Sequence, residues 1–69
     1  SNNSWPYKVV FGPDHPRRAE GTERFQWLYQ NIGTFTVDWN LMPAYSLDEP
    51  VIYLFRTASD RMRFALTWL

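Results

Sequence analysis

The chain has 69 residues, no cysteine and one histidine, which excludes disulfides and leaves too few ligands for a structural zinc site. A domain of this length buries only about 60% of its unfolded surface, so the aromatic residues, 19% of the chain, must supply a dense core or a binding surface. The formal net charge of zero argues against a general polyanion binder, and no apolar run approaches the roughly 20 residues that span a bilayer.

Residues 5–11 are the first predicted element, a strand. Tyr7, Val9 and Phe11 alternate with their neighbours and fall on one face of it. The four residues before the strand are polar and are expected to be disordered. Residues 12–16 include two prolines and a glycine, which end the strand.

A helix is predicted from residue 17 to residue 31, with Asp14 or His15 as its N-cap and Gly33 just beyond its end. Four large apolar residues share an arc of about 100°, the usual width of a face packed on a core. These residues are Phe25, Leu28, Tyr29 and Ile32. Trp27 lies about 200° from Phe25 and is therefore expected to face solvent.

Two further strands are predicted in the second half of the chain. Residues 34–41 alternate strictly between apolar and polar, which is typical of a half-buried strand. The apolar positions are Phe35, Val37, Trp39 and Leu41. Residues 50–56 carry apolar groups on both faces and are therefore expected to form the central strand of the sheet.

The last predicted element is a helix that runs to the end of the chain. Thr57 and Asp60 stand at the spacing of a capping box, which marks its start. The apolar residues of this helix sweep about 200° of its circumference, wider than a helix packed on one sheet needs. We therefore expect a partner or a second copy to contact it, unless the loop at 42–47 covers one flank.

The order β-α-β-β-α predicts an α+β fold with a three-stranded antiparallel sheet in the order 1-3-2 and both helices on one face. This is the ferredoxin-like (split βαβ) arrangement without its fourth strand, and residues 1–69 are expected to form one small domain. Eight residues are predicted to be mostly buried, and Phe35 joins them if the second strand has the register given above. The eight are Phe25, Leu28, Ile32, Val37, Trp39, Ile52, Leu54 and Ala65.

Residue types that support catalysis are sparse. His15 stands alone in a proline-flanked loop, and Asp48 and Glu49 are the only adjacent acidic pair. A general base or a nucleophile needs a partner that orients it, and no such pattern is visible. We therefore expect no enzymatic activity, no cofactor, no metal and no small-molecule substrate.

Tryptophan and arginine are frequent anchors of protein interfaces, which makes the two helices candidate binding elements. The candidate residues are Trp27 and, at the edge of the same helix face, Arg24, together with Phe64 and Trp68 on the last helix. The predicted partner is a protein or a second copy of the chain. No membrane partner is expected.

The alternative is an RNA- or single-stranded DNA-binding domain, because the element order resembles an RNA-recognition motif without its last strand. Such domains stack bases on aromatic side chains of the central strands. Here the candidates are Tyr7, Phe11, Tyr53 and Phe55. No Lys/Arg-Gly pair precedes the third-strand aromatics and the charge is neutral, so packing in an ordinary core is the competing role for Tyr53 and Phe55.

Residues 50–68 resemble a group of small uncharacterised proteins encoded by tailed bacteriophages. Those proteins end in a short aromatic strand, an acidic turn and a helix that reads Phe-x-Leu-x-Trp. The matching residues are Tyr53, Phe55, Asp60, Phe64, Leu66 and Trp68. The group usually has alanine where this chain has Arg61, and often glycine where it has Leu69.

The resemblance covers about a third of the chain. It implies a phage accessory protein in the cytoplasm of an infected bacterium, with binding to a host or viral protein and no enzymatic activity. It also implies that Leu69 is the natural end of the chain.

Overall fold

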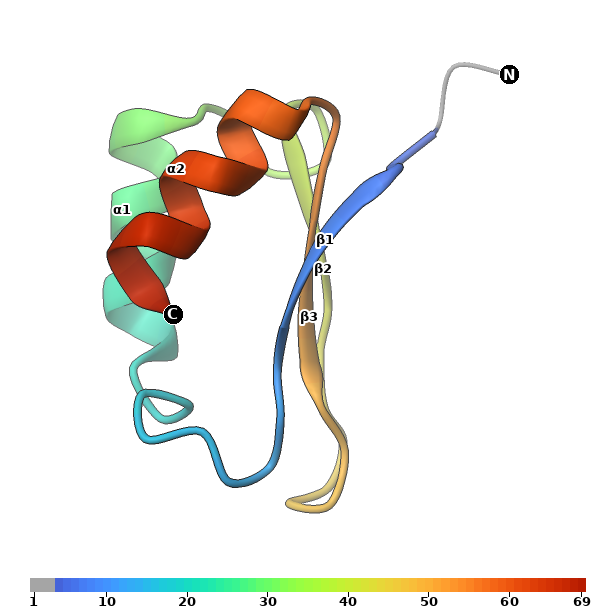
Figure 1. The fold of residues 1–69 in the computed structure, drawn as a ribbon, viewed down its shortest axis with the longest axis vertical. Coiled ribbons are helices and arrows are strands. Elements are labelled where there is room, and N and C mark those ends of the chain that lie inside the picture. Colours follow the sequence, from blue (N-terminus) through green and yellow to red (C-terminus); the bar gives the residue numbers. More distant parts are fainter. Residues whose placement is uncertain (1–3) are drawn as a thin grey trace.

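Three strands and two helices build the fold in a computed structural model that describes residues 4–69 (Figure 1). In chain order they are β1 (Tyr7–Phe11), α1 (Gly21–Asn31), β2 (Trp39–Met42), β3 (Val51–Phe55) and α2 (Ala58–Trp68). The strands form one antiparallel sheet in the order β1-β3-β2. The predicted β-α-β-β-α order and the 1-3-2 sheet are therefore confirmed.

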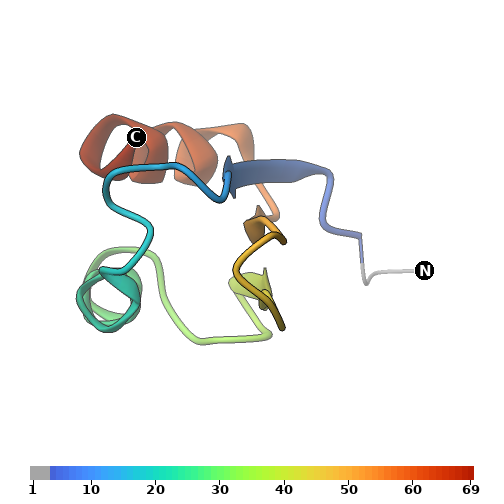
Figure 2. The same cartoon turned by 90° about the horizontal axis from the view of Figure 1, so that it is seen from below.

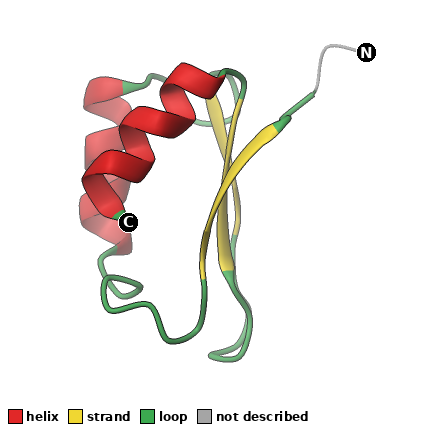
Figure 3. Cartoon of the chain, viewed as in Figure 1, coloured by secondary structure: helices red, strands yellow, loops and turns green. Residues whose placement is uncertain are grey.

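Both helices lie on one face of the sheet, and none of the described elements lies over the other face (Figures 1 and 3). The view from below places α2 over the β1 side of the sheet and α1 toward the β2 side (Figure 2). The strand register aligns Val9 and Leu41 with Tyr53 of the central strand, on the side that the helices cover. The sheet is thus covered on one side only.

The core between sheet and helices consists mostly of aromatic rings. Its buried apolar residues are Val9, Phe11, Leu28, Trp39, Tyr53, Phe55, Phe64 and Trp68. The Phe64 ring centre lies 4.8 Å from that of Tyr53 and 5.2 Å from that of Phe55. The high aromatic content therefore serves the core, because six of these eight side chains are aromatic.

Helix α1 begins at Gly21, four residues later than predicted. Residues 16–19 form turns, and the His15 Nδ1 accepts a hydrogen bond from the Arg17 N–H at 3.0 Å. A longer helix would use the carbonyl oxygens of Arg17 and Arg18 for its own ladder, but both accept hydrogen bonds from the Arg24 guanidinium. The side chain of Arg24 thus occupies the carbonyl oxygens that an earlier start of the helix would need for its own hydrogen bonds.

Strand β2 begins at Trp39, so the predicted strand over residues 34–38 is wrong. This segment is a turn: Asp38 Oδ2 accepts a hydrogen bond from the Thr34 N–H at 2.8 Å, and Thr36 has a φ of 68°. Gly33, the predicted residue after the helix, has a φ of 141°, and a Cβ there would overlap the Asp38 carboxylate. These side-chain contacts override the alternating pattern.

Burial agrees with the prediction at some positions and not at others. Leu28 and Trp39 are buried as predicted, whereas Phe25 and Val37 are exposed, so their assignment to the core is wrong. Five further predicted residues are partly buried. They are Ile32, Phe35, Ile52, Leu54 and Ala65.

Hydrogen bonds hold the start of α2 and the first described residue of the chain. Thr57 caps α2 as predicted, its hydroxyl accepting from the Asp60 N–H at 3.1 Å. Disorder was expected for residues 1–4; residues 1–3 lie outside the described part, and the Ser4 carbonyl accepts a hydrogen bond from Arg56 at 3.1 Å. Within residues 4–69, neither helix has the length and apolar character to cross a bilayer.

Candidate functional site

The face of α1 that meets the sheet differs from the predicted one. Arg24 and Leu28 are its buried residues, whereas Phe25 and Tyr29 are exposed at its flank. The ring centre of Phe25 still lies 5.2 Å from that of Trp39, so this flank covers the β2 end of the core. The helix is therefore rotated about its axis relative to the prediction. As a result the two candidate anchors on it, Arg24 and Trp27, lie closer to the core than predicted.

Arg24 was predicted at the edge of a binding surface, but only 1% of it is exposed. Its Nε donates to the Tyr53 hydroxyl at 2.7 Å, and its two terminal nitrogens donate to the carbonyl oxygens of Arg17 and Arg18. The guanidinium also lies 4.4 Å from the ring centre of Phe11. Arg24 is thus a structural residue that joins α1, the preceding loop and the sheet, and its assignment as an interface contact is wrong.

Trp27 was predicted to face solvent, but it is partly buried and packs on the core. Its ring centre lies 5.9 Å from that of Phe64, so it fills the space between the two helices. The prediction failed because it took Phe25 as part of the buried face of the helix, whereas the buried residues of α1 are Arg24 and Leu28.

Replacing Trp27 with alanine is expected to lower the free energy of unfolding by about 1–3 kcal/mol, since a partly buried ring is lost. Chemical denaturation followed by circular dichroism measures this change. Gln26→Ala is the matched control, because Gln26 is the exposed preceding residue of the same helix. Equal stability of the two variants would contradict the packing of Trp27 between the helices.

Phe64 and Trp68, the candidate anchors on α2, are also in the core. Phe64 is fully buried and Trp68 is 6% exposed, its ring lying under the Arg17 guanidinium at 4.4 Å. Neither side chain is accessible to a partner, so their prediction as interface residues is wrong. They form the inward half of the broad apolar sweep.

The outward half of that sweep is largely uncovered and forms what we name the outer stripe, namely Ala58, Met62, Leu66 and Leu69, with the partly buried Ala65 at its border with the core. Leu66 is 80% exposed, Leu69 60% and Met62 56%. An open hollow of about 570 Å³ lies along it, lined also by Ser59 and Arg61. The loop that could have covered this flank does not, because its own Tyr45 and Leu47 are exposed.

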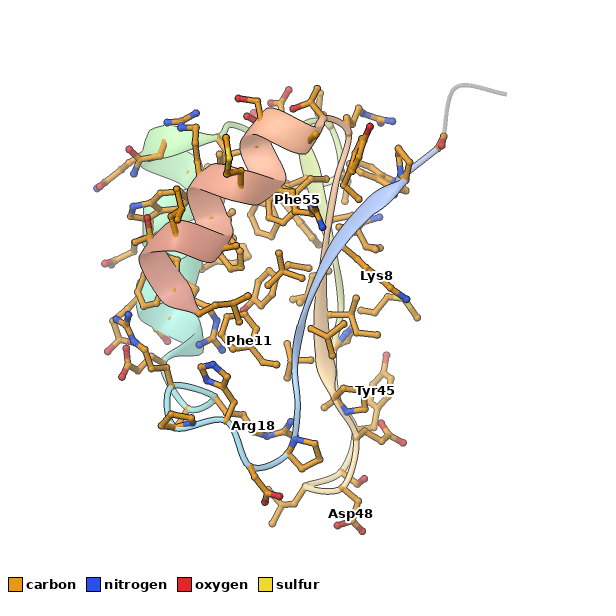
Figure 4. All side chains as sticks on the ribbon, viewed as in Figure 1. Lys8, Phe11, Arg18, Tyr45, Asp48 and Phe55 are labelled. Carbon is orange, nitrogen blue, oxygen red and sulfur yellow. The ribbon has the colours of Figure 1, made fainter. Side chains whose placement is uncertain are left out.

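The four candidate base-stacking residues do not form a platform. Phe11, Tyr53 and Phe55 are buried beneath the helices, and Tyr7 is partly buried on the same side (Figure 4). The open face of the described strands carries no aromatic side chain. Its residues are Lys8, Val10, Asn40, Met42, Ile52 and Leu54. Their prediction as stacking residues is wrong, because the helices cover the aromatic side of the sheet.

A second hollow of about 860 Å³ lies between the loops at residues 13–19 and 44–51. Arg18 bridges these loops by donating to the Ser46 carbonyl at 3.2 Å, and the side chains of Arg18, Tyr45 and Asp48 project in this region (Figure 4). His15 also lines the hollow, but its Nδ1 already accepts the Arg17 N–H. Among residues 4–69, no three His, Asp or Glu side chains gather in a way that could hold a metal ion.

Comparison of the chain with protein-family models, with curated proteins and with solved structures found no match. Its candidate functional surface is therefore defined by its own geometry. The outer stripe of α2 was foreseen in part, because the 200° apolar sweep indicated a flank beyond the core. Which half of the sweep faced outward was not foreseen.

Proposed function

We propose that this chain is a non-enzymatic interaction protein that binds another protein through α2. The observation that supports this proposal is the outer stripe, where Met62, Leu66 and Leu69 present large apolar side chains to solvent. Exposing such groups has no benefit for folding, and a contiguous exposed apolar patch marks interaction surfaces. Leu66 has the largest exposed fraction of these residues.

The biological context that we propose is a bacteriophage accessory protein that binds a host or viral protein in the cytoplasm of the infected cell. The resemblance of residues 50–68 to the phage group supports this context. Within the Phe-x-Leu-x-Trp motif, Phe64 and Trp68 would then pack in the core, and Leu66 would be the residue that contacts the partner.

Leu66→Glu is expected to abolish capture of a protein partner from bacterial lysate, because a buried carboxylate without a counter-charge is strongly unfavourable at an interface. Leu47→Glu is the matched control, since Leu47 is the same residue type, is 86% exposed and lies outside α2. The captured proteins are identified by mass spectrometry with and without nuclease, after circular dichroism has established that both variants are folded.

The proposal requires that one protein is retained by wild type and by Leu47→Glu, is lost with Leu66→Glu, and survives nuclease. Equal capture by both variants would place the binding surface elsewhere. A partner that is lost on nuclease treatment would favour nucleic-acid binding instead, and so would a steep fall in affinity with salt.

A further inference from the structure

The edge of β1 is an unpaired strand edge. In the described sheet β1 pairs only with β3, so one side of its backbone has no neighbouring strand. The opposite edge, on β2, is partly closed, because the Thr36 N–H donates to the Trp39 carbonyl at 2.7 Å and Phe35 bridges to Trp39. Open edges can accept an additional strand through main-chain hydrogen bonds, and the edge of β1 is the less protected of the two.

The outer stripe of α2 lies next to this edge. Figure 2 places α2 over the β1 side of the sheet, with no further described element beyond it. The Arg61 guanidinium lies 5.8 Å from the ring centre of Tyr7, which fixes this flank of the helix to the start of β1. A strand added beside β1 would therefore form main-chain hydrogen bonds to the edge and place alternate side chains toward Ala65, Met62 and Leu66.

The charges beside this edge are positive. Lys8 projects from the open face of β1, away from the helices (Figure 4), and Arg61 stands on the helix side. Neither forms an ion pair within residues 4–69, whereas Arg17 pairs with Glu20 at 3.1 Å and Arg63 with Asp60 at 3.8 Å. A carboxylate on the open face of an incoming strand would thus find Lys8 without a competing ion-pair partner.

We propose that the edge of β1 and the outer stripe together bind an extended segment of the partner protein as a fourth strand, with apolar side chains toward α2 and acidic ones beside Lys8 on the open face. This inference rests on the proposed protein-binding function and names the chemistry of the partner. A second copy fits less well, because pairing β1 with β1 would bring the Lys8 side chains of both copies to the shared edge.

The test uses the whole chain, labelled with ¹⁵N, and a capped heptapeptide of alternating Glu and Val as the probe. Binding is expected to shift the amide signals of Tyr7–Phe11 and of the outer stripe, and to slow hydrogen exchange at alternate β1 amides. The same peptide with Lys in place of Glu, and the variant Lys8→Glu, should each bind about tenfold more weakly. Arg63→Glu, the same change of charge on α2, is the matched control and should bind as wild type, since Arg63 is paired with Asp60.

The inference is overturned by shifts that lie elsewhere, by no binding, or by equal binding of the Glu and Lys peptides. It is also overturned if the β1 signals shift with protein concentration alone, which would identify a second copy as the occupant. If Leu66→Glu abolishes partner capture while the β1 edge takes no part, the interaction function stands and only strand addition fails.

Discussion

Replacing Arg24 with alanine is expected to lower the free energy of unfolding by about 3–4 kcal/mol, because three hydrogen bonds from the buried guanidinium are lost. The Tyr53 hydroxyl and the carbonyl oxygens of Arg17 and Arg18 all bond to this one guanidinium. A chain of this length has a total stability of about 4–10 kcal/mol. The loss is therefore a large share of the total, and urea denaturation followed by tryptophan fluorescence measures it.

Arg24→Lys separates the geometry of the guanidinium from its charge. An ammonium group keeps the charge but lacks the planar fork of donors, so this variant is expected to lose about 2 kcal/mol. Arg63→Ala is the control, since Arg63 is exposed and its change should stay within about 0.5 kcal/mol. Wild-type stability of Arg24→Ala would show that these hydrogen bonds contribute nothing net to folding.

The overall fold could be predicted from the sequence because its signals are local. Apolar groups on both faces of Val51–Phe55 placed this strand in the centre of the sheet, and Thr57 with Asp60 marked the start of α2. The order 1-3-2 then followed from connection rules. Each of these inferences needs only neighbouring residues or general topology, and the structure confirms them.

The orientation of α1 could not be predicted because its cause is not local. A helical wheel places an arginine on the solvent side of a helix. Arg24 is nevertheless buried, because its guanidinium donates hydrogen bonds to Tyr53, which is 29 positions away, and to the loop before the helix. Residues 34–38 were mispredicted for a local reason, because Asp38 accepts a hydrogen bond from the Thr34 N–H and closes a turn, whereas the alternation of apolar residues indicated a strand. Side-chain hydrogen bonds to the backbone decided both segments.

The candidate site was predictable in its location but not in its residues. The broad apolar sweep indicated α2, and the outer stripe lies there. Because both halves of the sweep are apolar, the wheel alone does not distinguish the core half from the exposed half. The preference for tryptophan as an interface anchor then favoured Trp68 and Trp27, which the small aromatic core uses instead.

Phe64 and Leu66 are two positions apart on α2 and give opposite expectations. Phe64→Ala is expected to lower the free energy of unfolding by about 3–5 kcal/mol, as removal of a buried ring from a core does. Its ring contacts those of Phe11, Trp27, Tyr53 and Phe55, so the cavity would open at the centre of the molecule.

Leu66→Ala is expected to change the stability by no more than about 0.5 kcal/mol, because the side chain is 80% exposed. Alanine also favours a helix slightly more than leucine does, which further limits any loss. Urea denaturation of the two variants beside wild type measures both values with the same assay. A large loss for Leu66→Ala would mean that the outer stripe is covered within the folded chain, and the surface proposed for the partner would then be part of the core.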